Sequence, residues 1–161
     1  MTDWPSRGPF VLHLRRLEVA WLSVYEGAAA HVQGLLRTAG RNMEHLALTI
    51  DEVPPHRKDL YADILDLSCN PRLVSLHLKS VLISQENSMD WVTTILSKIT
   101  SVHSRLQRIH FSVRMQRIEP SVHMQPEQLD RQLARVAEGR PHLVVTFILR
   151  WRSQNLTGWD P

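Results

Sequence analysis

The sequence predicts a short α/β solenoid, with parallel strands on its concave face and helices on its convex side. Two observations support this prediction. A short apolar pattern recurs along the chain, and between its copies the spacing of apolar residues changes from that of a strand to that of a helix. One strand–helix unit cannot bury its own apolar face, so such units must stack on their neighbours. Stacking aligns the strands into a parallel sheet with helices packed against it.

The repeated pattern is apolar-x-x-apolar-x-apolar, and each copy predicts one strand. It occurs at residues 14–19, 43–48, 73–78 and 106–111. The starts lie 29, 30 and 33 residues apart, and a fifth apolar run, Leu143 to Leu149, begins 37 residues after Leu106. The order predicts a single domain over residues 1–161 with four to five strand–helix units. Because solenoids need polar ends, residues 150–161 are expected to form a C-terminal cap or tail.

Four helices are expected between these strands. Asp90 is a suitable N-cap for the third helix, and Pro126 suits the first turn of the fourth. Gly40 and Gly139 stand where a C-cap glycine is typical. The alternative is an ordinary α/β domain whose strands merely resemble one another. The predicted buried positions are Ala29, Val32, Leu35, Leu36 and Ala39 in the first helix, Leu60, Ile64, Leu65 and Leu67 in the second, Val92, Ile95, Leu96 and Ile99 in the third, and Leu129, Leu133 and Val136 in the fourth.

At the repeated leucine positions the chain resembles the leucine-rich-repeat family, over roughly residues 12 to 150. Its long, irregular repeats resemble the repeat region of divergent fungal F-box proteins. This resemblance implies repeats that select a substrate protein, beside a separate helical F-box that docks onto a ubiquitin-ligase adaptor. The first repeat begins by Leu14, so the F-box itself is expected to be absent. The chain is then expected to be a fragment, a degenerate relative or a stand-alone binding module.

Alternation along the strands predicts a row of residues on the sheet face opposite the helices. Apart from Glu18 this row is neutral or basic. We expect it to bind an acidic protein segment, with Arg16, Lys79 and Arg108 as charged contacts. The alternative is a solvated face whose charges keep the sheet soluble. The predicted partner-binding residues are Arg16, Glu18, His45, His77, Lys79, Arg108 and His110.

Two histidines of this row, His77 and His110, occupy equivalent positions on neighbouring predicted strands. Structural zinc sites need four ligands and catalytic ones three, so a pair of imidazoles predicts no metal site, and no other cofactor is expected. The two central tryptophans, Trp21 and Trp91, flank predicted elements. Because aromatic bulk is normally buried, we expect both at the edge of the core rather than as exposed anchors.

The function expected from the sequence is that of a non-enzymatic protein–protein interaction module. No Gly-x-Ser-x-Gly, P-loop or dinucleotide-binding motif occurs. A net charge of +3 and basic runs of only two residues make nucleic acid a less favoured partner. A basic solenoid that binds RNA or another polyanion remains the alternative, as does a degenerate fragment without a partner. The single cysteine and the lack of a membrane-length apolar run predict a cytoplasmic or nuclear protein with no membrane partner.

The last predicted strand, Leu143 to Leu149, is apolar at nearly every position. Such a sequence is typical of a parallel strand buried on both faces. If it lies instead at the edge of the sheet, its unpaired backbone groups can recruit another chain. Self-association through this strand is therefore a further expectation.

Overall fold

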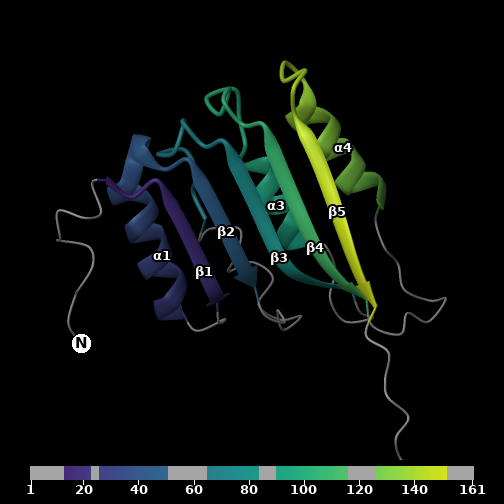
Figure 1. Ribbon diagram of the computed structural model, residues 1–161, viewed down its shortest axis with the longest axis horizontal. Helices are drawn as coiled ribbons and strands as arrows, with labels where there is room; N and C mark the ends of the chain where they lie inside the picture. The colour runs from purple at the N-terminus through teal and green to yellow at the C-terminus, as the bar shows by residue number, and fades with distance from the viewer. Residues whose placement is uncertain (1–12, 23–25, 51–64, 84–89, 116–125, 152–161) are drawn as a thin grey trace, which may run out of the picture.

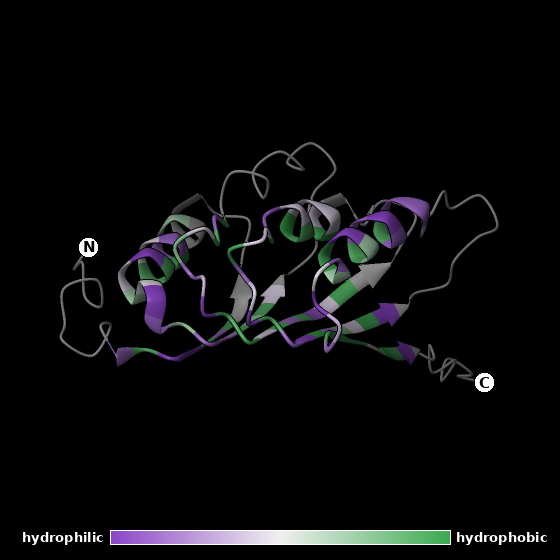
Figure 2. Ribbon diagram, turned by 90° about the horizontal axis from the view of Figure 1, so that it is seen from above, coloured by the Kyte–Doolittle hydropathy of each residue, from purple (hydrophilic) through white to green (hydrophobic). Residues whose placement is uncertain are grey.

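The computed structural model describes residues 13–22, 26–50, 65–83, 90–115 and 126–151. These residues form one five-stranded parallel sheet whose strand order is β1-β2-β3-β4-β5 (Figure 1). The helices of this part of the chain all lie on one face of the sheet, so the described architecture has two layers (Figure 2). The predicted α/β class with a parallel sheet is thus confirmed.

Strands β1 to β4 overlap the repeated apolar pattern, β5 overlaps the fifth apolar run, and each helix has a helical period. The strands are β1 Arg16–Leu22, β2 His45–Ile50, β3 Ser75–Ile83, β4 Arg108–Met115 and β5 Val144–Trp151. The helices are α1 Glu26–Ala39, α3 Asp90–Ser97 and α4 Pro126–Ala137, with a short 3₁₀ helix, η2 Gly40–Asn42, after α1. The first two residues of the range predicted as a C-terminal cap or tail, Arg150 and Trp151, are the last two residues of β5. Residues 152–161 lie outside the described part.

The cross-strand register aligns the apolar positions of successive strands, which places them together on the helix-covered face. In the three central strands these side chains are almost completely buried, and residues of the helices pack against them in one core. This is the core that the pattern predicts. The two aligned rows are Leu17, Leu46, Leu76, Ile109 and Val145, and Val19, Leu48, Leu78, Phe111 and Phe147.

Three of the four predicted helices are confirmed as α1, α3 and α4, and most of their predicted core residues are buried. In α1 these are Val32, Leu36 and Ala39; Leu35 is half-buried, and the side chain of Ala29 lies outside the described residues. Val92, Ile95 and Leu96 of α3 and Val136 of α4 are buried; Ile99 is also buried but follows the end of α3, and Leu129 and Leu133 are half-buried. Trp91 is buried, as expected, whereas the side chain of Trp21 is not described.

The predicted second helix is wrong at its C-terminal end. Leu65 and Leu67 are buried, but neither is helical; Leu60 and Ile64 lie outside the described residues. The Gln33 side chain pairs with the backbone of Asp66, because its Nε2 donates to the Asp66 carbonyl at 3.1 Å and its Oε1 accepts from the Asp66 N–H at 2.8 Å. Those backbone groups therefore bond to α1. The two leucines on either side of Asp66 alternate into the core with a period of two, not a helical one.

A similar turn precedes each of the last four strands. The N–H groups of Met43, Leu73, Leu106 and Leu143 each donate to the carbonyl three residues earlier, at 3.3, 3.1, 3.1 and 3.0 Å. The accepting residues are Gly40, Asn70, His103 and Arg140. Gly40 has φ +48°, and Gly139, next to the last of these residues, has φ +73°. Both are left-handed conformations that glycine adopts without strain, which confirms the two predicted C-cap positions.

The side chains at three of these turn positions bind the preceding unit. Asn70 is fully buried, and its Nδ2 donates to the carbonyls of Leu36 at 2.8 Å and Gly40 at 3.0 Å. His103 is also fully buried, and its Nε2 lies 2.9 Å from the Leu67 carbonyl oxygen while its Nδ1 accepts from the Thr100 N–H. These contacts fix the neutral tautomer that carries its proton on Nε2.

Two arginines extend the same arrangement to the last unit. The Arg140 guanidinium donates to the carbonyls of Thr100 and His103. Arg135 of α4 donates to the carbonyls of Leu96 at 2.7 Å and Ile99 at 2.9 Å. A cation at the C-terminal end of α3 is favoured by the helix dipole, and its hydrogen bonds add to the one that the Leu96 carbonyl accepts from the Ile99 N–H. Polar side chains thus join each of these units to the one before it.

Candidate functional site

The predicted binding residues lie on the face of the sheet that no described helix covers, which we call the open face (Figure 2). The cross-strand register brings most of them into two rows. Lys79 lies outside these two rows: it follows His77 by two residues on β3 and pairs with Thr49 of β2. The alternation along the strands therefore predicted correctly which residues are neighbours on the open face. The rows are Arg16, His45, Ser75, Arg108 and Val144, and Glu18, Ala47, His77, His110 and Thr146.

Lys79 and Glu18 form an ion pair across β2. The Lys79 Nζ donates to Glu18 Oε1 over Ala47, whose small side chain leaves room for the contact. This hydrogen bond is the main cause of the lowered pKa of the Glu18 carboxyl, followed by the Lys79 charge. Lys79 was predicted as a charged contact for a partner, but in the unbound chain its charge is paired with Glu18.

Two histidines of the open face pair with serines of the next strand. His45 Nδ1 lies 2.8 Å from Ser75 Oγ, and His77 Nε2 lies 2.9 Å from Ser112 Oγ. Each contact uses one ring nitrogen and one hydroxyl, and either partner can donate according to the tautomer. The centre of the face is therefore a hydrogen-bonded polar surface rather than a set of unpaired side chains.

His77 and His110 are close together, as the predicted equivalence of their positions requires. Their ring centroids lie 5.6 Å apart, and the ring planes are tilted by 56°. Partial burial is the largest cause of a lowered pKa for His77, and the positive charge of Lys79 and the His110 ring lower it further. A lowered pKa keeps the His77 ring neutral at pH 7. The described residues contain no group of three or more histidine, cysteine or acidic side chains placed to hold a metal ion.

The open face carries several arginines, and two of them, Arg16 and Arg108, lie in one cross-strand row. Both side chains are exposed and form no ion pair with a described residue, although the Arg16 charge helps to lower the pKa of the Glu18 carboxyl. They lie three strands apart, with His45 and Ser75 between them. At about 4.8 Å per strand, their backbones are separated by roughly 14 Å.

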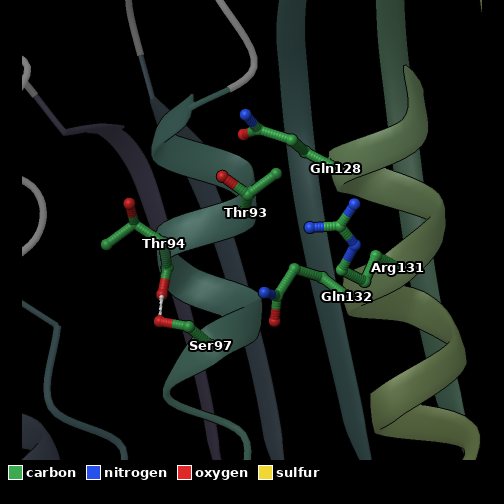
Figure 3. A pocket seen from close by; sticks show the side chains of 6 residues that line it. All are labelled: Thr93, Thr94, Ser97, Gln128, Arg131 and Gln132. Carbon is green, nitrogen blue, oxygen red and sulfur yellow. Dashed lines mark hydrogen bonds between the residues drawn. The ribbon is translucent and has the colours of Figure 1, made fainter. Parts of the chain in front are cut away.

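A groove lies on the opposite side of the molecule, between α3 and α4 (Figure 3). Its volume is about 270 Å³, and every lining side chain carries a hydroxyl, amide or guanidinium group. Sites for small organic ligands are mostly apolar, so this lining does not favour one. No sequence motif marks the groove, because its residues look like the solvated faces of two amphipathic helices. The lining residues are Thr93, Thr94, Ser97, Gln128, Arg131 and Gln132.

No family model, curated protein or solved structure matches this chain. None of the described helices is long and apolar enough to cross a membrane. Cys69 is exposed in a turn and forms no disulfide. The open face is therefore the part of the described structure with the strongest case for binding.

Proposed function

We propose that this chain is a non-enzymatic protein-interaction module whose open face binds an acidic segment of a partner protein. The observation that supports this proposal most directly is the pair Arg16 and Arg108. Both are exposed, share one cross-strand row, and form no ion pair with a described residue. Unpaired cations on an uncovered sheet face favour a ligand of opposite charge.

The spacing of the two arginines suggests the form of the ligand. An extended peptide rises about 3.3 Å per residue, so roughly 14 Å corresponds to about four residues. An acidic segment that crosses the strands could therefore place carboxylates on both guanidinium groups, with His45 and Ser75 contacting the residues between them. Arginine suits this role because its planar guanidinium can bind a carboxylate through two parallel hydrogen bonds.

The wider architecture we propose is a short leucine-rich-repeat solenoid. Two regularities support it: the in-register apolar rows of successive strands, and the turn that recurs at Gly40, Asn70, His103 and Arg140. In an F-box-like protein such repeats would recognise the substrate of the ligase, and we propose this as the setting of the open face. A cytoplasmic or nuclear location is part of the same proposal.

The test uses the intact chain and a fluorescent ten-residue peptide with two glutamates four positions apart. The double variant Arg16→Glu/Arg108→Glu is expected to weaken peptide binding by about tenfold or more, measured by fluorescence anisotropy. The matched control is Arg41→Glu/Arg131→Glu, which changes the net charge equally at two exposed arginines outside the open face. Its affinity should change by no more than about twofold. Equal losses in the two double variants would contradict the proposal.

The polyanion alternative is tested with the same proteins. A single-stranded uridine 20-mer replaces the peptide, and binding is measured between about 50 and 200 mM salt, where phosphate contacts lose affinity steeply. Tighter binding of the RNA than of the peptide, with a steep salt dependence, would assign the face to nucleic acid. We expect weak RNA binding because the described part of this face carries few cations and one of them, Lys79, is paired with Glu18.

A further inference from the structure

Among the described residues, β5 is the last strand of the sheet and pairs with β4 alone (Figure 1). Within the described residues, five large apolar side chains are exposed, and four of them belong to this strand. The exposed fractions are 56% for Val144, 45% for Phe147, 41% for Ile148 and 65% for Leu149. Because Val144 and Ile148 lie in rows of the open face while Phe147 and Leu149 align with helix-covered positions, both faces of the strand are apolar and exposed. An exposed apolar edge strand is a template for pairing with another strand.

The opposite edge of the sheet has a different character. β1 presents Arg16 and Glu18, which are both exposed, and its apolar residues Leu17 and Val19 are half-buried. Charged side chains on an edge strand discourage pairing with other chains. A head-to-tail contact between β5 of one copy and β1 of another would therefore set apolar residues of β5 against the charged residues Arg16 and Glu18, which disfavours β1 as the occupant of the β5 edge.

We propose that β5 pairs antiparallel with β5 of a second copy of this chain, about a two-fold axis at Phe147. Apolar residues lie on both sides of Phe147: Val144 and Val145 before it, and Ile148 and Leu149 after it. In the paired strands, Ile148 would face Thr146 of the second copy, and Leu149 would face Val145. Each of these pairs stays on one face of the sheet, so the two five-stranded sheets would join into one with all described helices on the same side.

The charged residue of β5, Arg150, favours antiparallel over parallel pairing of the two β5 strands. Within Val144–Trp151 the only ionisable side chain is Arg150, and no acidic residue is present. Parallel pairing in register would place two Arg150 side chains next to each other, and like charges directly opposite each other are destabilising. The two-fold arrangement places Arg150 opposite Val144 and separates the two guanidinium groups by six residues along the strand, or roughly 20 Å.

In the dimer, a second aromatic ring would cover the exposed side of the Phe147 ring. In one copy this ring stacks on Phe111 of β4, with centroids 4.8 Å apart and planes within 13°. The other side of the ring faces solvent, and 45% of the surface of Phe147 is exposed. At the two-fold axis, Phe147 of the second copy would occupy that side, which extends the aromatic row across the junction and removes apolar surface from water.

The test is sedimentation velocity of the full chain at about 1 to 100 µM, a range that spans the affinity of many homodimers. A dimer that dissociates on dilution is expected. Ile148→Lys places a charge on the edge strand and should weaken dimerisation by at least about tenfold without lowering the thermal midpoint of the monomer. Val102→Lys is the matched control, because Val102 is 51% exposed in a turn outside β5. It should remain dimeric. A monomer at every concentration, or equal dimerisation of the two variants, overturns the proposal.

Cross-linking distinguishes this dimer from other contacts. In a background with Cys69→Ser, which removes the native cysteine, a single cysteine is introduced by Phe147→Cys or, as a control, by Val102→Cys. Oxidation should link the chains through position 147, since only a residue at the two-fold axis faces itself in the second copy. A dimer that links through neither position 147 nor its neighbours Thr146 and Ile148 overturns the proposal. So does a monomer that dimerises only after removal of residues 152–161, because the tail of the chain would then be the occupant.

Discussion

The central strands and the last strand of the sheet have similar apolar sequences but opposite environments. Leu46, Leu76 and Ile109 on β2, β3 and β4 are at most 1% exposed, whereas Leu149 on β5 is 65% exposed. All of them align with the helix-covered rows of the sheet. The difference is the number of neighbours: a central strand has a strand on each side and helices above it, and β5 has a described strand on one side only (Figure 1). Stacking of the next unit, rather than side-chain hydrophobicity alone, determines burial in this sheet.

The largest expected effect compares the same substitution in the two regions. Leu76→Ala should lower the free energy of unfolding by about 2 to 5 kcal/mol, because it removes a fully buried side chain and leaves a cavity. Leu149→Ala should cost less than about 1 kcal/mol at a protein concentration low enough to keep the chain monomeric, since little apolar area is lost. Urea denaturation measures both. Similar losses for the two variants would show that β5 is covered in solution.

Local periodicity was sufficient to predict the strands and three of the helices. The period of two and the period of 3.6 residues depend on neighbouring residues only, so they can be read along the chain. The position of β5 at the edge and the extended conformation of residues 65–67 depend on other parts of the molecule. Leu65 and Leu67 fit a helical pattern in the sequence, but Gln33 of α1 binds the Asp66 backbone and holds the segment in another conformation.

The next largest effect concerns the buried turn that joins the units within the central region. Asn70→Ala removes two hydrogen bonds to the carbonyls of Leu36 and Gly40 and should lower the free energy of unfolding by about 1 to 3 kcal/mol. Asn70→Asp should cost more, because it places a buried carboxylate against two carbonyl oxygens. Ser104→Ala, at an exposed position in the next turn, is the control and should change stability by less than about 0.5 kcal/mol. If Asn70→Ala behaves like this control, the inter-unit contact contributes nothing measurable.

The polar contacts between units were not predictable from the sequence. Asn70, His103 and Arg140 perform similar roles, yet they are three different residue types at unequal spacings. On the open face, alternation predicted which residues are neighbours, because backbone register alone decides it. The Glu18–Lys79 pair was not predicted, since it depends on the conformations of two long side chains and on the small residue Ala47 beneath them.

A smaller effect is expected from that ion pair. Glu18→Gln should change the free energy of unfolding little, because both partners are solvent-accessible and salt screens them. It should nevertheless strengthen binding of the acidic peptide, by about twofold to fivefold, because Lys79 loses its intramolecular carboxylate partner. Fluorescence anisotropy at low salt measures this gain. Adding Lys79→Met to Glu18→Gln is the control that should abolish it, and a gain that persists in the double variant would exclude Lys79 as its source.

The smallest expected effect is a pH dependence that arises at His77. Its pKa is below the ordinary value of 6.5 in the folded chain, mainly because of burial, so the unfolded chain binds a proton more readily. The groups around the ring have opposing effects: Lys79 and His110 lower the pKa, and Glu18 raises it. Stability should therefore be fully present above pH 6.5 and decline as the pH falls through the lowered folded pKa.

Replacing His77 separates its contribution to the pH dependence of stability from the contributions of the other histidines. His77→Gln cannot titrate but can still hydrogen-bond Ser112, which in the native chain lies 2.9 Å from His77 Nε2. Its urea midpoint should fall less steeply than that of the native chain as the pH is lowered from about 7 to 5, and the remaining histidines contribute to both curves. The lowered pKa values of Glu18 and Asp66 act at more acidic pH, below their ordinary values of 4.5 and 3.8. Parallel curves for the native chain and His77→Gln between pH 7 and 5 would mean that His77 takes up its proton equally well in the folded and unfolded chains. The open face would then gain positive charge near neutral pH.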